Sequence, residues 1–118
     1  MATFEYPIEV LDLTRARRAP VQALVDTGAM FTLLSGSLLR GLGITPTRTM
    51  EFTLADGRVV EREIGEAVVR IGGEETTATV IFGDEGHQAV LGAHALEGLL
   101  LAVDPHGRRL VPTRGLLM

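Results

Sequence analysis

The stretch LVDTGAMFTLLS, residues 24–35, decides the fold because it sets one carboxylate between two apolar runs. Both runs have the composition of short buried strands, which places Asp26 on the loop that joins them. A carboxylate in apolar surroundings loses several kcal/mol of hydration unless partners compensate, so it needs a structural or chemical reason to be there. Asp26, Thr27 and Gly28 therefore form either a polar turn between strands or a catalytic loop.

Length and composition predict a single globular domain over residues 1–118. Hydrophobic residues make up 46% of the chain and charged residues 22%, which suffices for one core and argues against extended disorder. The sequence contains no cysteine. A disulfide framework, a thiolate metal site and thiol chemistry are therefore excluded.

Charge and hydropathy patterns argue against two classes of partner. The N-terminal segment has no basic region leading into an apolar one, and the longest uncharged apolar run, residues 98–103, is too short to span a bilayer. We therefore expect a soluble, cytoplasmic protein with no membrane partner. The net charge is -4, and the basic residues are scattered except for Arg15, Arg17 and Arg18, which we expect on a solvated loop. This pattern predicts no nucleic-acid partner.

Alternating apolar residues and turn signals predict a mostly β fold for most of the chain. Residues 4–10 alternate with a period of two, and Pro7 favours an edge strand. The Asp-Gly pair in residues 55–57 and the segment 72–75 are typical of hairpin turns. The expected strands are residues 4–10, 21–25, 30–34, 49–54, 58–64, 66–71, 76–82, 89–92, 100–103 and 108–112.

Two short helices complete the expected elements. Residues 35–43 have leucines at helical spacing, with Ser35 as the N-terminal cap and Gly43 suited to a left-handed C-terminal position. Residues 93–99 form a second helix of one or two turns. An apolar strand, a glycine-containing turn and a short helix thus occur twice, with Gly92 standing where Gly28 stands. Many short strands with regular turn signals and only two short helices predict a barrel or a sandwich core.

Together these features resemble the retropepsin-like aspartic proteases, the family of retroviral proteases and their bacterial relatives. The matching segments are LVDTGA at residues 24–29, the helix after it, the hairpin FTLADGRVV at residues 52–60, and AVLGAHAL at residues 89–96. The resemblance implies a closed retropepsin-like β-barrel with one or two short helices, one lobe per chain. It also implies an aspartic endopeptidase without a metal or cofactor.

Chemistry then predicts a homodimer. Hydrolysis of an amide without a covalent intermediate needs one group to take a proton from water and another to give one to the leaving nitrogen, which paired carboxylates can do. The chain offers one Asp-Thr-Gly, and its other acidic residues lie in polar hairpins and turns. The second catalytic carboxylate must therefore be Asp26 of another copy, across a two-fold axis.

The resemblance implies roles for the residues around Asp26. The N–H of Gly28 would hold the Asp26 carboxylate, and the Thr27 hydroxyl would bond across the two-fold axis to the partner loop. A peptide or protein substrate would bind as an extended strand. The substrate-binding residues implied in this way are Gly28 and Ala29, together with Ala55, Asp56 and Gly57 at the tip of the family's flap hairpin. Apart from the resemblance, the alternating strand near Phe4 and the apolar end LVPTRGLLM, residues 110–118, would otherwise leave exposed edges, so we expect the termini to form the dimer seam.

One departure leaves a second function open. The family's flap tip is usually rich in glycine and apolar residues, whereas this one carries Asp56 and Arg58. The alternative is a catalytically inactive retropepsin-fold module for dimerisation or protein binding.

The remaining ionisable residues predict no site. His87, His94 and His106 lack the spacing of a helical zinc pair, and we expect His94 to cap or pack at the start of its helix. Glu97 and Asp104 are expected on a helix surface and in a turn.

Overall fold

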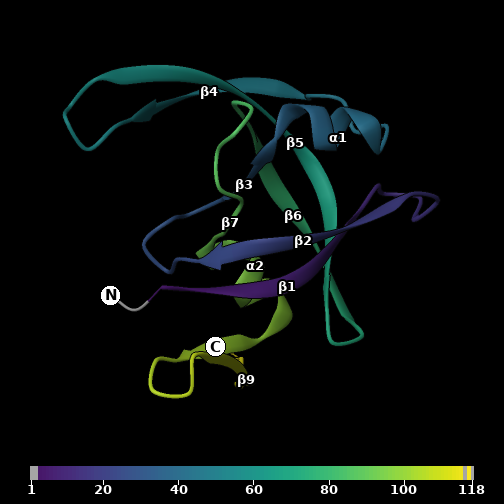
Figure 1. Cartoon of the computed structure of the whole chain (residues 1–118), viewed down its shortest axis with the longest axis vertical. Helices are drawn as coiled ribbons and strands as arrows, with labels where there is room; N and C mark the ends of the chain where they lie inside the picture. Colours follow the sequence, from purple (N-terminus) through teal and green to yellow (C-terminus); the bar gives the residue numbers. More distant parts are fainter. Residues whose placement is uncertain (1–2, 116, 118) are drawn as a thin grey trace.

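The computed structural model describes residues 3–115 and 117, which form nine strands and two short helices (Figure 1). The strands are β1 (Phe4–Leu11), β2 (Arg18–Val25), β3 (Thr32–Ser35), β4 (Arg48–Thr53), β5 (Val59–Ile71), β6 (Glu74–Gly83), β7 (Val90–Leu91), β8 (Leu101–Asp104) and β9 (Arg109–Pro112), and the helices are α1 (Gly36–Gly41) and α2 (Ala93–Leu99).

Strand pairing closes the main sheet on itself. Its strand order is β1-β2-β7-β3-β6-β5-β4, and β1 also pairs with β5. Six of the described strands therefore form a ring, and β4 extends from it. Fully buried aliphatic side chains fill the interior. They include Val10, Val25, Leu34, Leu39, Val69, Val80 and Leu91. The mostly β class with a closed core is confirmed.

Strand β1 is an edge over only part of its length. Pro7 is exposed and lies opposite Gln22 of β2, as expected of an edge position. Residues Glu9 to Leu11 pair with β5 as well, in register with Arg70 to Val68. The predicted edge strand is thus correct for the first half of β1 and wrong for the second half, which closes the ring.

Strand β5 corrects the prediction of two strands separated at Gly65. It is a single strand of 13 residues that pairs first with β4 and then with β6. Gly65 is buried, and a Cβ there would lie 3.0 Å from the carbonyl oxygen of Thr45 and 3.1 Å from the Phe82 ring. Glycine is needed at this position for close packing rather than for a turn.

Both predicted helices are present. Ser35 accepts a hydrogen bond from the N–H of Leu38 at 3.2 Å and so caps α1, and Gly43 after the helix has φ of +80°. Helix α2 packs on β6, where a Cβ on Gly98 would lie 2.3 Å from the Thr76 hydroxyl oxygen. Within the described part of the chain, neither helix has the length and hydropathy to span a membrane.

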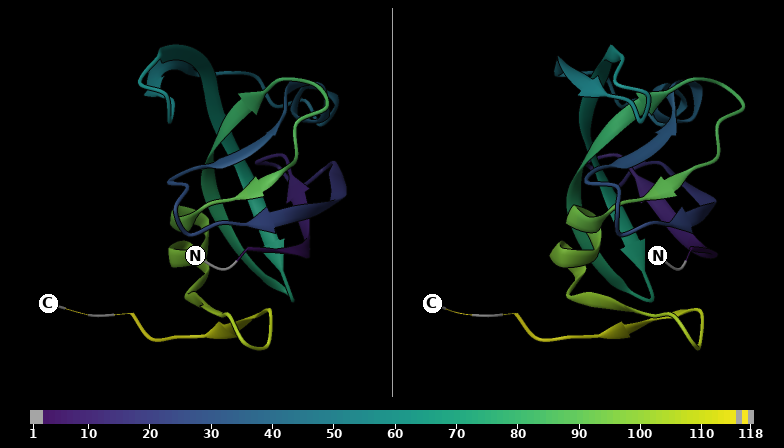
Figure 2. Two further views of the ribbon diagram at one scale, coloured as in Figure 1. Left: turned by 60° about the vertical axis from the view of Figure 1, so that its left-hand side comes forward. Right: turned by 90° about the vertical axis from the view of Figure 1, so that its left-hand side faces the viewer.

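Two hairpins project from the ring. Strands β4 and β5 with the turn between them, called here the flap hairpin, overhang the loop that carries Asp26 (Figure 1). Strands β8 and β9 form a separate two-stranded sheet at the opposite end of the molecule, and residues 113–115 run away from the body (Figure 2). The flap hairpin and the Asp26 loop thus lie on the same side of the molecule, and a candidate site lies between them.

Candidate active site

Three strands position Asp26. Strand β7 lies between β2 and β3, parallel to β2 and antiparallel to β3, so the loop of residues 26–31 crosses the end of β7. The N–H of Asp26 donates to the carbonyl oxygen of Leu91 at 3.1 Å. Asp26 therefore directly follows the buried end of β2, and its backbone is hydrogen-bonded to the neighbouring strand β7.

The start of α2 fixes the other end of the loop. The N–H groups of Ala93 and His94 donate to the carbonyl oxygens of Ala29 and Met30, at 2.7 and 3.1 Å. Helix N–H groups in the first turn have no partner within the helix, so the loop carbonyls satisfy them. The Gly92 N–H donates to the hydroxyl of buried Thr32 at 3.2 Å. The internal repeat seen in the sequence thus corresponds to two segments that pair beside Asp26.

The Asp26 carboxylate is held by its own loop. Its Oδ1 accepts a hydrogen bond from the N–H of Gly28 at 2.9 Å, the contact that the resemblance implies. Asp26 is partly exposed, and Thr27 and Gly28 are exposed. The carboxylate is therefore oriented and accessible.

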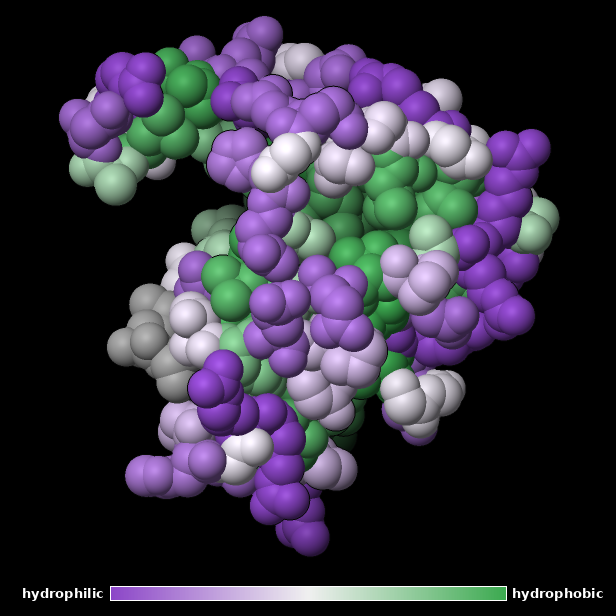
Figure 3. All heavy atoms as spheres, viewed as in Figure 1, coloured by the Kyte–Doolittle hydropathy of each residue, from purple (hydrophilic) through white to green (hydrophobic). Residues whose placement is uncertain are grey.

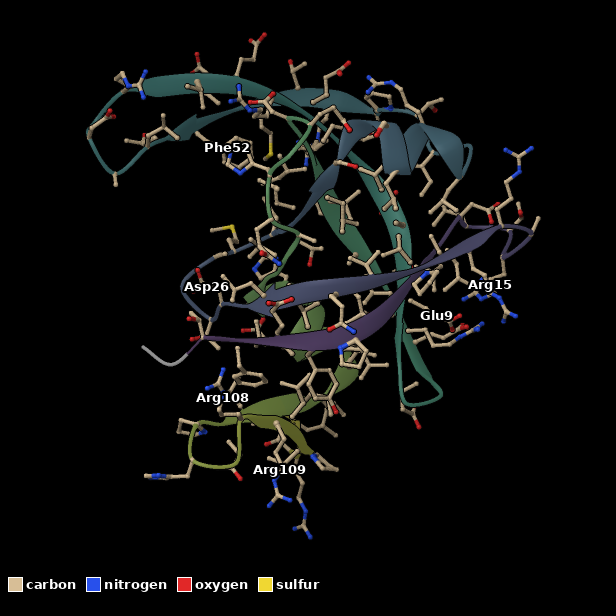
Figure 4. All side chains as sticks on the ribbon, viewed as in Figure 1. Glu9, Arg15, Asp26, Phe52, Arg108 and Arg109 are labelled. Atoms are coloured by element: carbon tan, nitrogen blue, oxygen red, sulfur yellow. The ribbon has the colours of Figure 1, made fainter. Side chains whose placement is uncertain are left out.

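Beside Asp26 lies a cavity of about 270 Å³, called here the apolar cavity. Among the described residues that line it, Asp26 alone is ionisable. Phe31 of the loop and Phe52 of β4 meet edge to face across it, with ring centroids 6.5 Å apart. Figure 4 shows Asp26 and Phe52 on opposite sides of the opening. The lining residues are Asp26, Ala29, Met30, Phe31, Leu33, Phe52, Ile81 and Val90.

A second cavity of about 160 Å³, called here the outer cavity, adjoins the first and shares Leu33, Phe52 and Ile81 with it. The surface is hollowed between the flap hairpin and the body, and hydrophobic residues are exposed in the hollow (Figure 3). The remaining residues of the outer cavity are Leu54, Val60, Arg62, Gly83, Asp84 and His87.

The structure separates the predicted substrate-binding residues into two groups. Ala29 lines the apolar cavity with Asp26, and Gly28 contacts the Asp26 carboxylate. Ala55, Asp56 and Gly57 are exposed at the hairpin tip and line neither cavity. The part of the flap hairpin that does line the cavities is Phe52, Leu54, Val60 and Arg62.

The flap tip is closed by its own charges. The Asp56 carboxylate accepts hydrogen bonds from the backbone N–H of Arg58 at 3.0 Å and from the Arg58 Nε at 2.7 Å. The backbone bond, followed by the guanidinium bond, lowers the pKa of Asp56. Gly57 has φ of +88°, which suits glycine in the turn. The tip is thus a solvated turn with an internal ion pair.

Phe31, Phe52 and Val90 line the site although sequence reasoning did not select them. A weak signal existed for Phe52, because Met50, Phe52 and Leu54 alternate with polar residues along β4 and so share its inward face. No local pattern shows that this face turns toward Asp26.

The histidines lie apart from one another. The His94 ring packs edge to face on Phe31 with centroids 5.2 Å apart, which confirms the packing role expected at the helix start. His87 lines the outer cavity, and the His106 N–H donates to Asp104 in a turn. Among the described residues, no group of three or more His, Asp or Glu side chains has a geometry that could hold a metal ion.

The predicted surface residues are on the surface, with one addition. Glu97 is exposed on α2, and the Asp104 carboxylate accepts bonds from the turn of residues 105–108 and from Arg109. Arg15 is exposed but not simply solvated, because it pairs with Glu75 at 2.8 Å. Arg17 and Arg18 are exposed, and Arg17 donates to the carbonyl oxygen of Gly41.

The family model described as "gag-polyprotein putative aspartyl protease" matches residues 14–98 of the chain. No curated protein sequence matches it. The matched residues include the Asp26 loop, the flap hairpin and nearly all of α2.

Solved structures share the fold over most of the chain. The EIAV protease complexed with the inhibitor HBY-793 has a TM-score of 0.60 at 19% identity, covering 92% of this chain and 91% of that chain. The simian foamy virus (mac) protease has a TM-score of 0.54 at 17% identity, covering 78% and 92%. A retropepsin-like aspartic protease from Rickettsia conorii has a TM-score of 0.50 at 23% identity, covering 85% and 84%. At these low sequence identities, the structural similarity establishes a shared fold and nothing beyond it.

Proposed function

Because the chain belongs to the gag-polyprotein aspartyl protease family, we propose that it is an aspartic endopeptidase that works as a homodimer. The retropepsin-like resemblance drawn from the sequence is confirmed at the level of family and fold. The observation that supports the proposal most directly is an accessible Asp26 carboxylate, held by the Gly28 N–H, beside an apolar cavity under a hairpin.

The proposed reaction uses two Asp26 carboxyl groups that share one proton. Two carboxylates close together cannot both ionise, so they titrate as a pair. The ionised Asp26 takes a proton from water as the water oxygen attacks the carbonyl carbon of the peptide bond. The protonated one gives its proton to the carbonyl oxygen. Collapse of this tetrahedral intermediate, with a proton passed to the leaving nitrogen, breaks the bond.

A homodimer is part of the proposal because, in the part of the chain that the structure describes, Asp26 supplies the one carboxylate in the lining of the apolar cavity. Thr27 beside it is exposed, which supports the proposed hydrogen bond from its hydroxyl to the partner's loop. The β8–β9 hairpin is a separate two-stranded sheet, so among the described residues neither of its outer edges pairs with another strand. Leu100, before β8, is 48% exposed. These features support the terminal segments as the dimer seam.

The proposed substrate is an extended segment of peptide or protein. It would pair with the backbone of Gly28 and Ala29 on one side and of the flap tip, residues 55–57, on the other. An apolar side chain of the substrate would enter the apolar cavity, whose lining is almost wholly apolar. The chain would act as one domain in the cytoplasm without a cofactor.

One observation favours the second candidate, an inactive module for dimerisation or protein binding. The Asp56–Arg58 pair holds the flap tip in a solvated turn. A tip of this kind presents charge to a partner protein as readily as it closes over a substrate.

Replacement of Asp26 separates the two candidates. Asp26→Asn keeps the shape and the Gly28 hydrogen bond but removes the ionisable group. We expect unstructured peptides to be cleaved at mildly acidic pH by the natural protein, with at least a thousandfold loss in the variant, since removal of such a group typically costs about this much. Mass spectrometry of the products measures this. Cleavage that survives the substitution would refute the pair of aspartates, and no cleavage by either protein would favour the binding module.

Subunit mixing tests the homodimer. If subunits of the natural protein and of Asp26→Asn exchange freely in equal amounts, the activity should fall to about one quarter of that of the same total amount of natural protein. Only dimers with two intact aspartates would work. A monomeric enzyme would keep about one half. Sedimentation of the same mixtures reports the mass and shows whether the subunits associate.

A further inference from the structure

We propose that the outer cavity is a specificity site in which Arg62 selects an acidic side chain of the bound peptide. The inference rests on the proposed function in one respect, namely that a peptide occupies the groove under the flap hairpin. It names a side-chain class and a residue that the fold alone does not give. Four observations support it, namely the position of Arg62, its present partner, the charges around the cavity and the shape of the cavity.

Arg62 occupies a position where the strand pattern calls for an apolar residue. Strand β5 alternates, so Val60, Arg62 and Ile64 share the inward face, and Glu61 and Glu63 share the outward face. Val60 is half-buried and Ile64 is buried. The Arg62 side chain is 35% exposed and lines the outer cavity, so it lies on the inward face of β5.

The present partner of Arg62 is a weak one. Among the described residues its only ion pair is with Asp84, at 3.5 Å, and the Asp84 side chain is 69% exposed. Ion pairs of exposed groups contribute little because water screens them. The Nη1 of Arg62 donates to the carbonyl oxygen of Glu61 at 3.0 Å, which orients the guanidinium. Because Nη2 contacts Asp84, the Nε–H and the second N–H of each Nη group remain for a ligand carboxylate, which can accept two parallel bonds from a guanidinium.

The charges around the outer cavity favour an acidic ligand over a basic one. Its ionisable residues are Arg62, Asp84 and His87. Glu63 is engaged with Arg40 at 2.8 Å, and the Glu85 carboxylate accepts bonds from Ser37. Arg62 is the more buried member of its ion pair. Water therefore screens the electrostatic interaction of Arg62 with a ligand less than it screens that of Asp84.

The shape of the cavity sets the position of the acidic residue. Leu54 and Val60 provide an apolar floor for a side-chain stem below the guanidinium, and the volume of about 160 Å³ admits one side chain. Side chains two residues apart in an extended peptide point to the same face. Because the two cavities adjoin, the acidic residue is expected two positions from the apolar residue that fills the apolar cavity.

The test measures binding in the Asp26→Asn background, so that no peptide is consumed. Fluorescein-labelled peptides carry leucine flanked at the two possible positions by Glu, Gln or Lys, and anisotropy gives the dissociation constants. We expect the better-placed Glu peptide to bind about tenfold more tightly than its Gln counterpart, the range of a hydrogen-bonded charge pair that is partly exposed. The Lys peptide should bind no better than Gln.

Two variants should move the preference in opposite directions. Arg62→Gln should reduce binding of the Glu peptide to that of Gln, whereas Asp84→Asn should strengthen it by removing the competing carboxylate. Arg17→Gln is the control, because it removes the same charge from the exposed loop between β1 and β2, where Figure 4 labels Arg15 on the side of the molecule away from Asp26 and Phe52. Circular dichroism confirms that each variant is folded.

Several outcomes would overturn the inference. They are equal binding of Glu and Gln, a Glu preference that survives Arg62→Gln, a Lys preference lost in Asp84→Asn, or no binding of any peptide. Digestion of the same peptides by the natural protein is read separately. Binding with the Glu preference but without cleavage would refute the endopeptidase and keep this inference. Cleavage without a Glu preference would do the reverse.

Discussion

At the scale of single residues, Gly92 determines the geometry of the Asp26 loop. A Cβ at this position would lie 2.6 Å from both the carbonyl carbon and oxygen of Phe31, and 2.9 Å from the carbonyl oxygen of Met30. These are backbone atoms, so they cannot move aside as a flexible side chain would. The loop carbonyls are also the partners of the first N–H groups of α2.

Gly92→Ala should therefore destabilise the protein. We expect a loss of about 1–3 kcal/mol in the free energy of unfolding, the usual cost of overpacking, and a fall in cleavage because the Asp26 loop is displaced. Urea denaturation measures the first effect. Gly41→Ala is the matched control, since a Cβ there meets nothing within 4 Å. Equal stability of the two variants would contradict the role assigned to Gly92.

Residues whose role is local were predictable, and those whose role is tertiary were not. Asp26 and Gly28 belong to one short motif, and Ser35 caps the helix that follows it. The runs on either side of Gly65 were predicted as two strands, whereas they form one, and the carbonyl oxygen of Thr45, 20 positions away in the sequence, leaves no room for a side chain at Gly65. Phe52 reaches the site only through the overhang of the flap hairpin.

At the scale of elements, a carboxylate fastens the loop between β6 and β7 to helix α1. Glu85 accepts hydrogen bonds from the Ser37 hydroxyl at 2.5 Å and from the Ser37 N–H at 3.1 Å. This loop carries Asp84 and His87, which form one wall of the outer cavity. The Ser37 hydroxyl, followed by its N–H, lowers the pKa of Glu85.

Acid should release this fastening. A carboxyl whose folded-state pKa is lowered contributes stability above its unfolded value of 4.5, and the contribution is lost as pH falls through the folded-state pKa. In an NMR titration, the Ser37 amide should therefore shift with a midpoint below 4.5. The shift should be absent in Glu85→Gln. A midpoint at or above 4.5 would show that the bond does not form in solution.

Hairpins and helix ends were the elements that sequence predicted best, because turn and cap residues act within a few positions. The closure of the ring by β1 and β5 was not predictable in the same way. It joins Leu11 to Val68 across 57 positions, and its buried valines are chemically no different from those of any other strand.

At the scale of the whole molecule, carboxylates with lowered pKa values set the acid limit of stability. Arg15 and then Arg70 lower the pKa of Glu75. Arg70 also pairs with Glu9, so these residues form a network across the ring closure, where Figure 4 labels Glu9 and Arg15. The same direction holds for four further carboxyl groups, each through hydrogen bonds to its carboxylate. They are Asp12, Asp56, Glu85 and Asp104.

Thermal stability should therefore be steady at neutral pH and fall in acid. These groups contribute above their unfolded values of 3.8 and 4.5, and the contribution is lost as pH drops through the lower folded-state values. Melting followed by circular dichroism from pH 7 downward measures the profile. In Arg15→Gln the pKa of Glu75 should rise toward 4.5, so the decline should begin at higher pH.

Arg108→Gln is the matched control for Arg15→Gln, because both arginines are exposed and have positive φ, 62° and 50°. Coincident profiles of the two variants would show that the Arg15–Glu75 pair does not contribute to the acid limit.

The continuity of β5 has a mechanical consequence. The overhanging hairpin and the wall of the ring are one piece of backbone, with no joint between them at Gly65. We therefore expect the hairpin to move most at its turn, near Gly57, and least at its base, where Thr45 and Phe82 pack closely on Gly65. Closure over a ligand would then require a small distortion of every residue along the first half of β5. The affinity for the ligand would depend on how readily residues 59–64 twist.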